Sequence, residues 1–162
     1  VQGPDGALYV ADFYNRIIGH YEVPLDNPGR DRVRGRIWRI TYDGVVNRAG
    51  WEDYTKAPLT RLIEALGADN LPLRMTAAEQ LVRRVGGPAV APLVRLLGNR
   101  RTRPVVVAHA LWVLRQLGAL PDDALTAALR HPDPLVRTHA LRVVLDGGDA
   151  AERKATLSAT DI

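Results

Sequence analysis

The chain has 162 residues, with 22 Lys and Arg against 18 Asp and Glu, and 46% of its residues are hydrophobic. This composition excludes a disordered chain and is typical of a folded globular protein. The absence of cysteine excludes disulfide bonds, cysteine-ligated zinc and thiol nucleophiles, and the single serine, Ser158, argues against a serine-nucleophile triad. No apolar run approaches the roughly 18 residues that a membrane span needs, and the first residues show no signal-peptide pattern.

The first 48 residues have the composition of β-strands. Eight of the nine aromatic residues precede position 55. A Pro-Asp-Gly turn at 4–6 leads into a predicted strand at 7–11, and residues 35–42 alternate in side-chain type with the period of two that strands have. A long polar connection, residues 12–34, separates the two strands. Because two strands cannot bury a sheet, the pair is expected either to pack on the helices or to belong to a larger β structure.

From Leu59 onward the sequence repeats. Segments that begin at Leu73, Val106 and Val136 align with steps of 33 and 30 residues, and each carries an alanine at the same place and an apolar residue four positions later. Proline at helix starts and glycine at helix ends mark the same boundaries, so the pattern predicts stacked helical pairs. The predicted helices are 58–67, 72–86, 88–98, 104–118, 122–130 and 134–146, with 149–159 expected to begin a further unit.

These patterns predict a mostly α fold, in which an α-solenoid of about three helix pairs follows a short β segment. The predicted organisation is a β region at 1–48, a linker at 49–56 and the solenoid at 57–162, with its last repeat truncated. Since the first residue is Val1 and not methionine, the chain is expected to be an internal piece of a longer protein.

The helical part resembles HEAT repeats over about residues 57–159, and the segment 134–141 is the closest match. The resemblance implies a right-handed solenoid whose surface binds a protein partner. HEAT repeats often place an Asp in the turn six residues before an Arg of the second helix, and that Arg is present as Arg74 and Arg137. The positions that correspond to the Asp are Ala68, Arg101 and His131.

The N-terminal part, residues 3–12 and 35–40, resembles the end of a β-propeller in large bacterial membrane-bound dehydrogenases, which are similar to quinoprotein glucose/sorbosone dehydrogenases. In that family HEAT repeats follow the propeller, often with a haem-binding cytochrome c segment after them. The resemblance implies an incomplete propeller blade, a periplasmic or secreted parent protein, and a sugar or alcohol oxidation site that uses PQQ. The chain has no haem-attachment motif, so haem would be held by a segment outside it, and no cofactor is predicted for this chain itself.

The same resemblance suggests roles for residues in the long connection. His20 would be the general base that removes a hydroxyl proton from the substrate. The residues that would contact the cofactor are Asp12, Asn15, Arg30, Asp31 and Arg32. The alternative is that these side chains only hold the connection in shape through hydrogen bonds and ion pairs. The chain alone is expected to be inactive, because a propeller needs at least about four blades.

Two other groups of residues suggest binding sites. His109 and His139 share a repeat position, and with His131 they could hold zinc, but hydrogen-bonded histidines are the commoner outcome and no metal site is predicted. The dense basic run at 100–103 could attract phosphate, but three arginines in a turn contribute little at physiological salt and are interpreted as solvated.

Three functions remain open. The preferred one is a fragment of a dehydrogenase-like propeller and HEAT-repeat protein, whose helical part is an interaction scaffold and whose propeller part borders an oxidation site. The second is a HEAT-repeat binding module with no catalytic role, and the third is a nucleic-acid-binding repeat protein that uses its arginines. The predicted partner is a protein bound at the solenoid surface, with no nucleic acid and no membrane contact from this chain.

Overall fold

The computed structural model describes residues 1–12, 23–31, 33–42, 52–147 and Ser158. The chain divides into two compact units, Val1–Trp51 and Glu52–Ile162. The described residues are mostly helical, with a short two-stranded antiparallel sheet in the N-terminal unit, which confirms the predicted mostly α fold. The assignment of these regions to a propeller blade, a linker and HEAT repeats stays a prediction.

The sheet consists of β1 (Leu8–Asp12) and β2 (Arg36–Ile40), both close to the strands predicted from composition and alternation. The strands pair antiparallel with Val10 opposite Trp38. The other edge of β1 is occupied in part by the first residues of the chain, because Gln2 bridges to Leu8. The strand pair is therefore flanked on one edge by the end of a third extended segment.

Both faces of the sheet are exposed. Residues that lie opposite one another in an antiparallel pair share a face, so Val10 and Trp38 lie on one face and Ile37 on the other. Trp38 is 49% exposed and Ile37 is 76% exposed. The described residues of the strand unit therefore cover neither face of the sheet.

An ion pair ties the turn before β1 to β2. Asp5 Oδ2 accepts hydrogen bonds from Arg39 Nε at 2.8 Å and from Tyr9 Oη at 3.0 Å. Gly6 in this turn has a φ of 81°, which a residue with a Cβ rarely adopts. The hydrogen bond from Arg39 is the main cause that lowers the pKa of Asp5, so this carboxylate stays charged at neutral pH.

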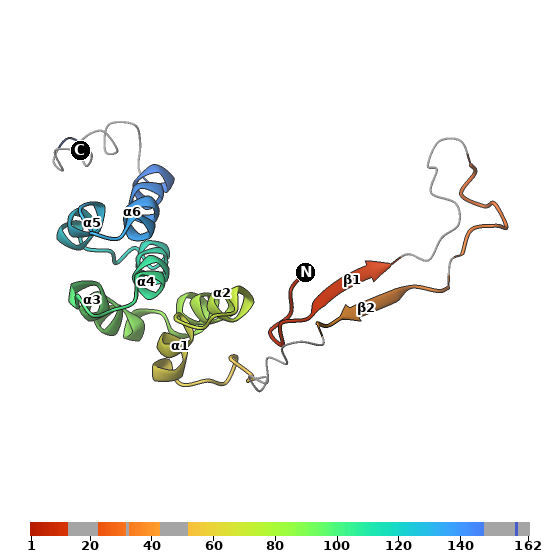
Figure 1. Ribbon diagram of the computed structural model, residues 1–162, viewed down its shortest axis with the longest axis horizontal. Coiled ribbons are helices and arrows are strands. Elements are labelled where there is room, and N and C mark those ends of the chain that lie inside the picture. Colours follow the sequence, from red (N-terminus) through yellow and green to blue (C-terminus); the bar gives the residue numbers. More distant parts are fainter. Residues whose placement is uncertain (13–22, 32, 43–51, 148–157, 159–162) are drawn as a thin grey trace. The chain divides into compact units, whose positions relative to one another are not determined.

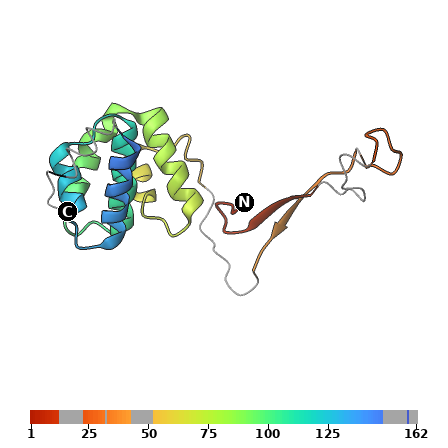
Figure 2. The ribbon, with the colours of Figure 1, turned by 90° about the horizontal axis from the view of Figure 1, so that it is seen from above.

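The described part of the helical unit, residues 52–147, contains three pairs of helices, and five of the six lie within a few residues of the predicted ranges. Figure 1 shows the first helices of the pairs in one layer and the second helices in another, and Figure 2 shows them side by side from above. The closest packing between pairs joins α4 to α6. The helices are α1 (Leu59–Ala65), α2 (Leu71–Gln80), α3 (Val90–Gly98), α4 (Pro104–Gln116), α5 (Asp122–Leu129) and α6 (Pro134–Asp146).

The second predicted helix, 72–86, differs from the structure in its last turn. The α-helix ends at Gln80 and continues as a π-helical turn, Leu81–Val85. Gly86 stops it with a φ of 64°, and a short 3₁₀ turn leads into α3. The predicted extension at 149–159 lies outside the described residues, apart from Ser158.

Two apolar clusters form the core, and α4 contributes to both. Leu114 packs in the cluster formed with α1, α2 and α3, whereas Leu111 packs in the cluster formed with α5 and α6. Both side chains are fully buried. The helix that lies between the two clusters therefore joins the third pair to the first two.

Residues before the first helix also belong to this core. Tyr54 is 6% exposed and packs with Leu62 and Leu66. Arg84 Nη2 donates to the carbonyl of Ala57 at 2.6 Å and to that of Tyr54 at 3.3 Å. The segment from Glu52 is thereby fastened to the helical unit.

Candidate functional site

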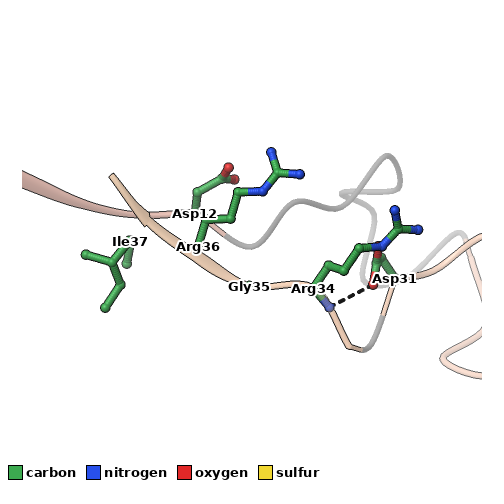
Figure 3. A pocket seen from close by; sticks show the side chains of 7 residues that line it. Asp12, Asp31, Arg34, Gly35, Arg36 and Ile37 are labelled. Carbon is green, nitrogen blue, oxygen red and sulfur yellow. Dashed lines mark hydrogen bonds and ion pairs between the residues drawn. The ribbon is translucent and has the colours of Figure 1, made fainter. Parts of the chain in front are cut away.

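A shallow hollow lies where β1 and β2 meet the long connection. Its volume is about 640 Å³ and Figure 3 shows it from close by. Asp12 and Arg36 enter it from the strand ends, whereas Asp31 and Arg34 enter it from the connection. The hollow brings together two carboxylates and two guanidinium groups, and two of the predicted cofactor contacts, Asp12 and Asp31, line it.

Asp31 organises the end of the connection. Its Oδ1 accepts the backbone N–H of Val33 at 3.1 Å and that of Arg34 at 3.0 Å, while its Oδ2 pairs with Arg34 Nε at 2.7 Å. The hydrogen bond from Val33 is the main cause that lowers the pKa of Asp31, with Arg34 adding to it. The carboxylate is therefore engaged by the loop that carries it.

The side chains at the strand end of the hollow also contact one another. Trp38 Nε1 donates to Asp12 Oδ2 at 3.0 Å, and the Arg36 guanidinium lies 5.7 Å from the centre of the Trp38 ring. Arg30, a third predicted contact, does not line the hollow. Its Nη2 donates to the Val23 carbonyl at 2.7 Å and its Nε donates to the Pro24 carbonyl at 3.0 Å.

The remaining predicted residues, His20, Asn15 and Arg32, lie outside the described residues, so their proposed roles stay predictions. A quinone such as PQQ carries carboxylates that need unpaired cations. The described part of the hollow does not fit this group, because Arg34 is paired with Asp31 and Arg36 lies over Trp38. Within the described ranges, no three His, Cys, Asp or Glu side chains gather closely enough to hold a metal ion.

A second and larger hollow lies in the helical unit. It is a groove of about 1080 Å³ between the α3–α4 turn and the α5–α6 turn. Its apolar floor is formed by Val94, Leu97, Val107, Ala127 and Ala128. The two alanines leave space between α3 and α5 that larger side chains would fill. Sequence patterns did not reveal this groove, because the residues that form it are brought together only by the stacking of two helical pairs.

The polar residues at the rim of the groove differ in how they are paired. Asp133 Oδ1 accepts the N–H of Leu135 at 2.8 Å and caps α6. Asp123 Oδ1 accepts the N–H of Ala124 at 2.8 Å at the start of α5. The Arg100 side chain, also at the rim, has no partner within the part of the chain that the structure describes.

Arginine side chains hold the turns of the first and third pairs. Arg74 Nη1 donates to the carbonyls of Ala68 and Asp69 at 2.6 and 2.9 Å. Arg137 Nη1 donates to the carbonyls of His131 and Pro132 at 2.8 and 2.7 Å. Both guanidinium groups thus bond to backbone oxygens of their turn, in which Ala68 and His131 stand six residues before the arginines. A guanidinium suits this role because its planar fork presents several donors, which gives a structural reason for an excess of arginine over lysine.

We call the hydrogen bonds from an arginine of the second helix to the carbonyls of the turn before it an arginine clamp. The middle pair lacks this clamp. Val107 occupies the repeat position of Arg74 and Arg137, and it forms part of the groove floor. The turn of the middle pair is fastened instead by Thr102, whose hydroxyl donates to the Leu96 carbonyl at 2.9 Å. Among the described residues, the turn of the middle pair is therefore the one that no arginine of its own second helix holds. The groove opens beside this turn.

Comparison with known proteins identifies a relative of the strand unit alone. Residues 1–44 match the family described as Domain of unknown function (DUF7133). No curated protein and no solved structure matches the chain. The DUF7133 match covers both strands and the connection between them, and it ends before the helical unit. It also carries no statement of activity, so the function must be argued from the residues. No helix among the described residues has the length and apolar character that a membrane crossing requires.

Two histidines link neighbouring second helices. His109 Nε2 accepts a hydrogen bond from Arg74 Nε at 3.2 Å, and His139 Nδ1 accepts one from Trp112 Nε1 at 3.0 Å. The first bond joins α2 to α4 and the second joins α4 to α6. His131, the third candidate for zinc, accepts the backbone N–H of a residue in its own turn at 3.0 Å. All three histidines thus serve as hydrogen-bond acceptors.

We expect the helical unit to lose stability as the pH falls below 6.5. Burial lowers the pKa of His109 and of His139 from 6.5, with further lowering by Arg74 and His139 at His109 and by Arg142 at His139. The unfolded chain therefore binds these protons at a higher pH than the folded chain. Their contribution to the free energy of unfolding is complete above pH 6.5 and is lost as the pH falls through the folded pKa values.

Urea denaturation midpoints at about pH 7.5, 6 and 5 measure this loss, in a range above the usual pKa of carboxyl groups. A variant with both His109→Gln and His139→Gln should show a flatter pH dependence over the same range. An equal loss of stability in this variant and in the unaltered protein would contradict the assignment.

Proposed function

We propose that the helical unit is a HEAT-like protein-binding scaffold whose binding surface lies on α2 and α6. The observation that carries this proposal is the distribution of exposed apolar side chains. Exposed apolar side chains that gather on a few elements are expected where a protein binds a partner. The large hydrophobic residues that the described part of the helical unit exposes all lie on α2 and α6: Leu71, Met75, Leu135, Leu141 and Leu145.

The arrangement of the helices supports the same proposal. The second helices of the three pairs lie in one layer (Figure 1), so α2 and α6 flank α4 on that layer. Stacked helical repeats commonly present such a layer as an extended binding surface. The repeated arginine clamps at Arg74 and Arg137 support the likeness to HEAT repeats, because they occupy equivalent positions in the first and third pairs.

Site-specific photo-crosslinking tests this surface in the full chain. A benzophenone side chain introduced at Thr76 on α2 or at Thr138 on α6, both exposed, should form a saturable adduct with a protein from an extract of the source cells. Thr60, exposed on α1 in the other layer, is the matched control. Equal labelling from Thr60, or labelling that excess unmodified chain does not suppress, would contradict the proposal.

A second proposal concerns the strand unit, which we interpret as part of a larger β structure such as a propeller blade. Two observations support it: apolar side chains are exposed on both faces of the sheet within the strand unit, and the first residues of the chain begin a further strand, because Val1 exchanges hydrogen bonds with Tyr9 at 2.7 and 2.8 Å along the edge of β1 that does not face β2. Sugar or alcohol oxidation with PQQ, and a periplasmic location, would then belong to a longer protein. A longer reading frame that encodes several segments like residues 5–10 would support this proposal, and one without them would contradict it.

A further inference from the structure

We infer that protonation of His109 on α4 and His139 on α6 separates neighbouring helical pairs, and that acid conditions thereby release a protein partner from α2 and α6. The loss of stability expected below pH 6.5 concerns the whole helical unit, whereas this separation leaves each pair folded. The separation of the pairs does not depend on the proposed function, and the release of a partner rests on it.

The two histidines hold equivalent positions in the repeat, and each bonds to the second helix of the preceding pair. His109 Nε2 accepts a hydrogen bond from Arg74 Nε of α2 at 3.2 Å, and His139 Nδ1 accepts one from Trp112 Nε1 of α4 at 3.0 Å. The first pair has Thr76 at this position, and its hydroxyl donates to a carbonyl of its own helix. Among the described residues, a histidine thus occurs where a second helix has a preceding pair to contact.

Protonation removes both hydrogen-bond acceptors. A neutral imidazole accepts a hydrogen bond through one nitrogen, but in the charged ring both nitrogens carry a proton and donate. The charged ring of His109 would face the guanidinium group of Arg74. The charged ring of His139 would present an N–H to the indole N–H of Trp112. Each of the two bonds that link neighbouring pairs therefore becomes an unfavourable contact when its histidine is protonated.

The surroundings of the two rings oppose a positive charge. Burial lowers the pKa of each ring from 6.5, and nearby cationic groups lower it further. These groups are Arg74 of α2 and His139 of α6 at His109, and Arg142 of α6 itself at His139. Within the described ranges no carboxylate acts on either ring, so the charge that the rings gain at low pH is not compensated.

The contacts inside each pair do not depend on the histidines. Arg74 Nη1 donates to two backbone carbonyls of its own turn, which do not titrate, so Arg74 stays bound to the first pair when its Nε–H loses His109. The packing of α2 on α4 is also less extensive than the packing of α4 on α6. We therefore expect the first pair to move away from the second more than the second moves away from the third.

Spin labels on α2 and α6 measure the separation in the full chain. The sequence contains no cysteine, so Thr76→Cys and Thr138→Cys, both at exposed positions, can be labelled selectively. Double electron–electron resonance gives the distance between the two labels at about pH 7.5 and at about pH 5, which is above the usual pKa of carboxyl groups. This distance should lengthen by about 2 Å or more at the lower pH, while circular dichroism shows an unchanged helix content.

Two histidine variants make the measurement specific. His109→Gln keeps an acceptor for Arg74 but does not titrate, so it should remove most of the lengthening. His131→Gln is the matched control, because His131 accepts a backbone N–H within its own turn, and it should leave the lengthening unchanged. The inference is overturned if the distance is equal at both pH values, if His109→Gln lengthens as the unaltered protein does, or if helix content falls in step with the distance.

Photo-crosslinking from Thr138 at the same two pH values tests the release of a partner. The yield of the saturable adduct should fall about fivefold at the lower pH in the otherwise unaltered chain and should change by less than about twofold in His109→Gln. An equal fall in both would overturn the release. If no saturable adduct formed at either pH, the scaffold proposal and the release that rests on it would both be wrong, whereas the distance between the spin labels would still decide whether the pairs separate.

Discussion

Truncation of Leu111 to Ala should lower the free energy of unfolding by about 3 kcal/mol, since large-to-small substitutions of buried leucine cost about 2–5 kcal/mol. Leu111 is fully buried and packs against Leu129, Val136 and Ala140 of the last pair. The lost contacts would not be regained, because α4 is fixed from its other side by the first core cluster. Guanidinium denaturation of the full chain measures the effect, and hydrogen exchange should show the largest loss of protection in α5 and α6.

Three further substitutions make this prediction specific. Leu114→Ala, the same truncation on the same helix, should cost a similar free energy but should reduce protection in α1 to α3, because Leu114 packs in the other cluster. Leu111→Met keeps the volume and should cost less than about 1.5 kcal/mol. Leu145→Ala removes an exposed side chain and should change stability by less than about 0.5 kcal/mol. Equal loss of protection throughout the helical unit for both truncations would contradict the two-cluster core.

Replacement of Arg74 by Ala should lower the free energy of unfolding by about 2 kcal/mol, because a hydrogen bond contributes about 1 kcal/mol and an arginine clamp makes several. Arg74 donates to the carbonyls of Ala68 and Asp69 and to the ring of His109. Arg74→Lys should recover less than half of the loss, since an ammonium group lacks the planar fork that reaches several acceptors. Urea denaturation at pH 7.5 compares the variants, at a pH of about one unit above the usual histidine pKa.

The matched comparison is Arg137, which holds the equivalent turn but bonds only to two carbonyls. Arg137→Ala should therefore cost less than Arg74→Ala. Arg95→Ala on the exposed side of α3 is the surface control and should change stability by less than about 0.5 kcal/mol. If the free energy of unfolding of Arg74→Lys equalled that of the unaltered protein, charge alone would explain the role of Arg74. The interpretation of Arg74 as a clamp would then be wrong.

The helices could be predicted from the sequence because each pair repeats the same local signals. Proline at the first turn, as at Pro104 and Pro134, and glycine past the last turn fix helix ends within a few residues. The π-helical turn at 81–85 left no such signal, since its apolar residues fit an ordinary helix as well. Tyr54 was grouped with the strand aromatics by composition, but its place is decided by the packing of Leu62 and Leu66 around it.

The candidate sites were less accessible to sequence reasoning. Arg74 and Arg137 could be picked out by their repeat position, but their acceptors are backbone oxygens, which no residue pattern reveals. The groove depends on the distance between two turns that are about thirty residues apart in the chain. The prediction of a cofactor site depends partly on residues beyond the described ones, and the contacts of Asp31 and Arg30 are made within their own loop.

The uneven fastening of the helical pairs has a mechanical consequence. A hydrogen bond connects the α1–α2 turn to the α3–α4 turn, because Arg103 Nη1 donates to the Gly67 carbonyl at 2.7 Å. The α3–α4 and α5–α6 turns are separated by the groove. In the other layer of helices, α4 and α6 pack closely against each other. Since fewer contacts join the second and third turns, we expect a change in the width of the groove to cost less free energy than a change in the spacing of the first two turns.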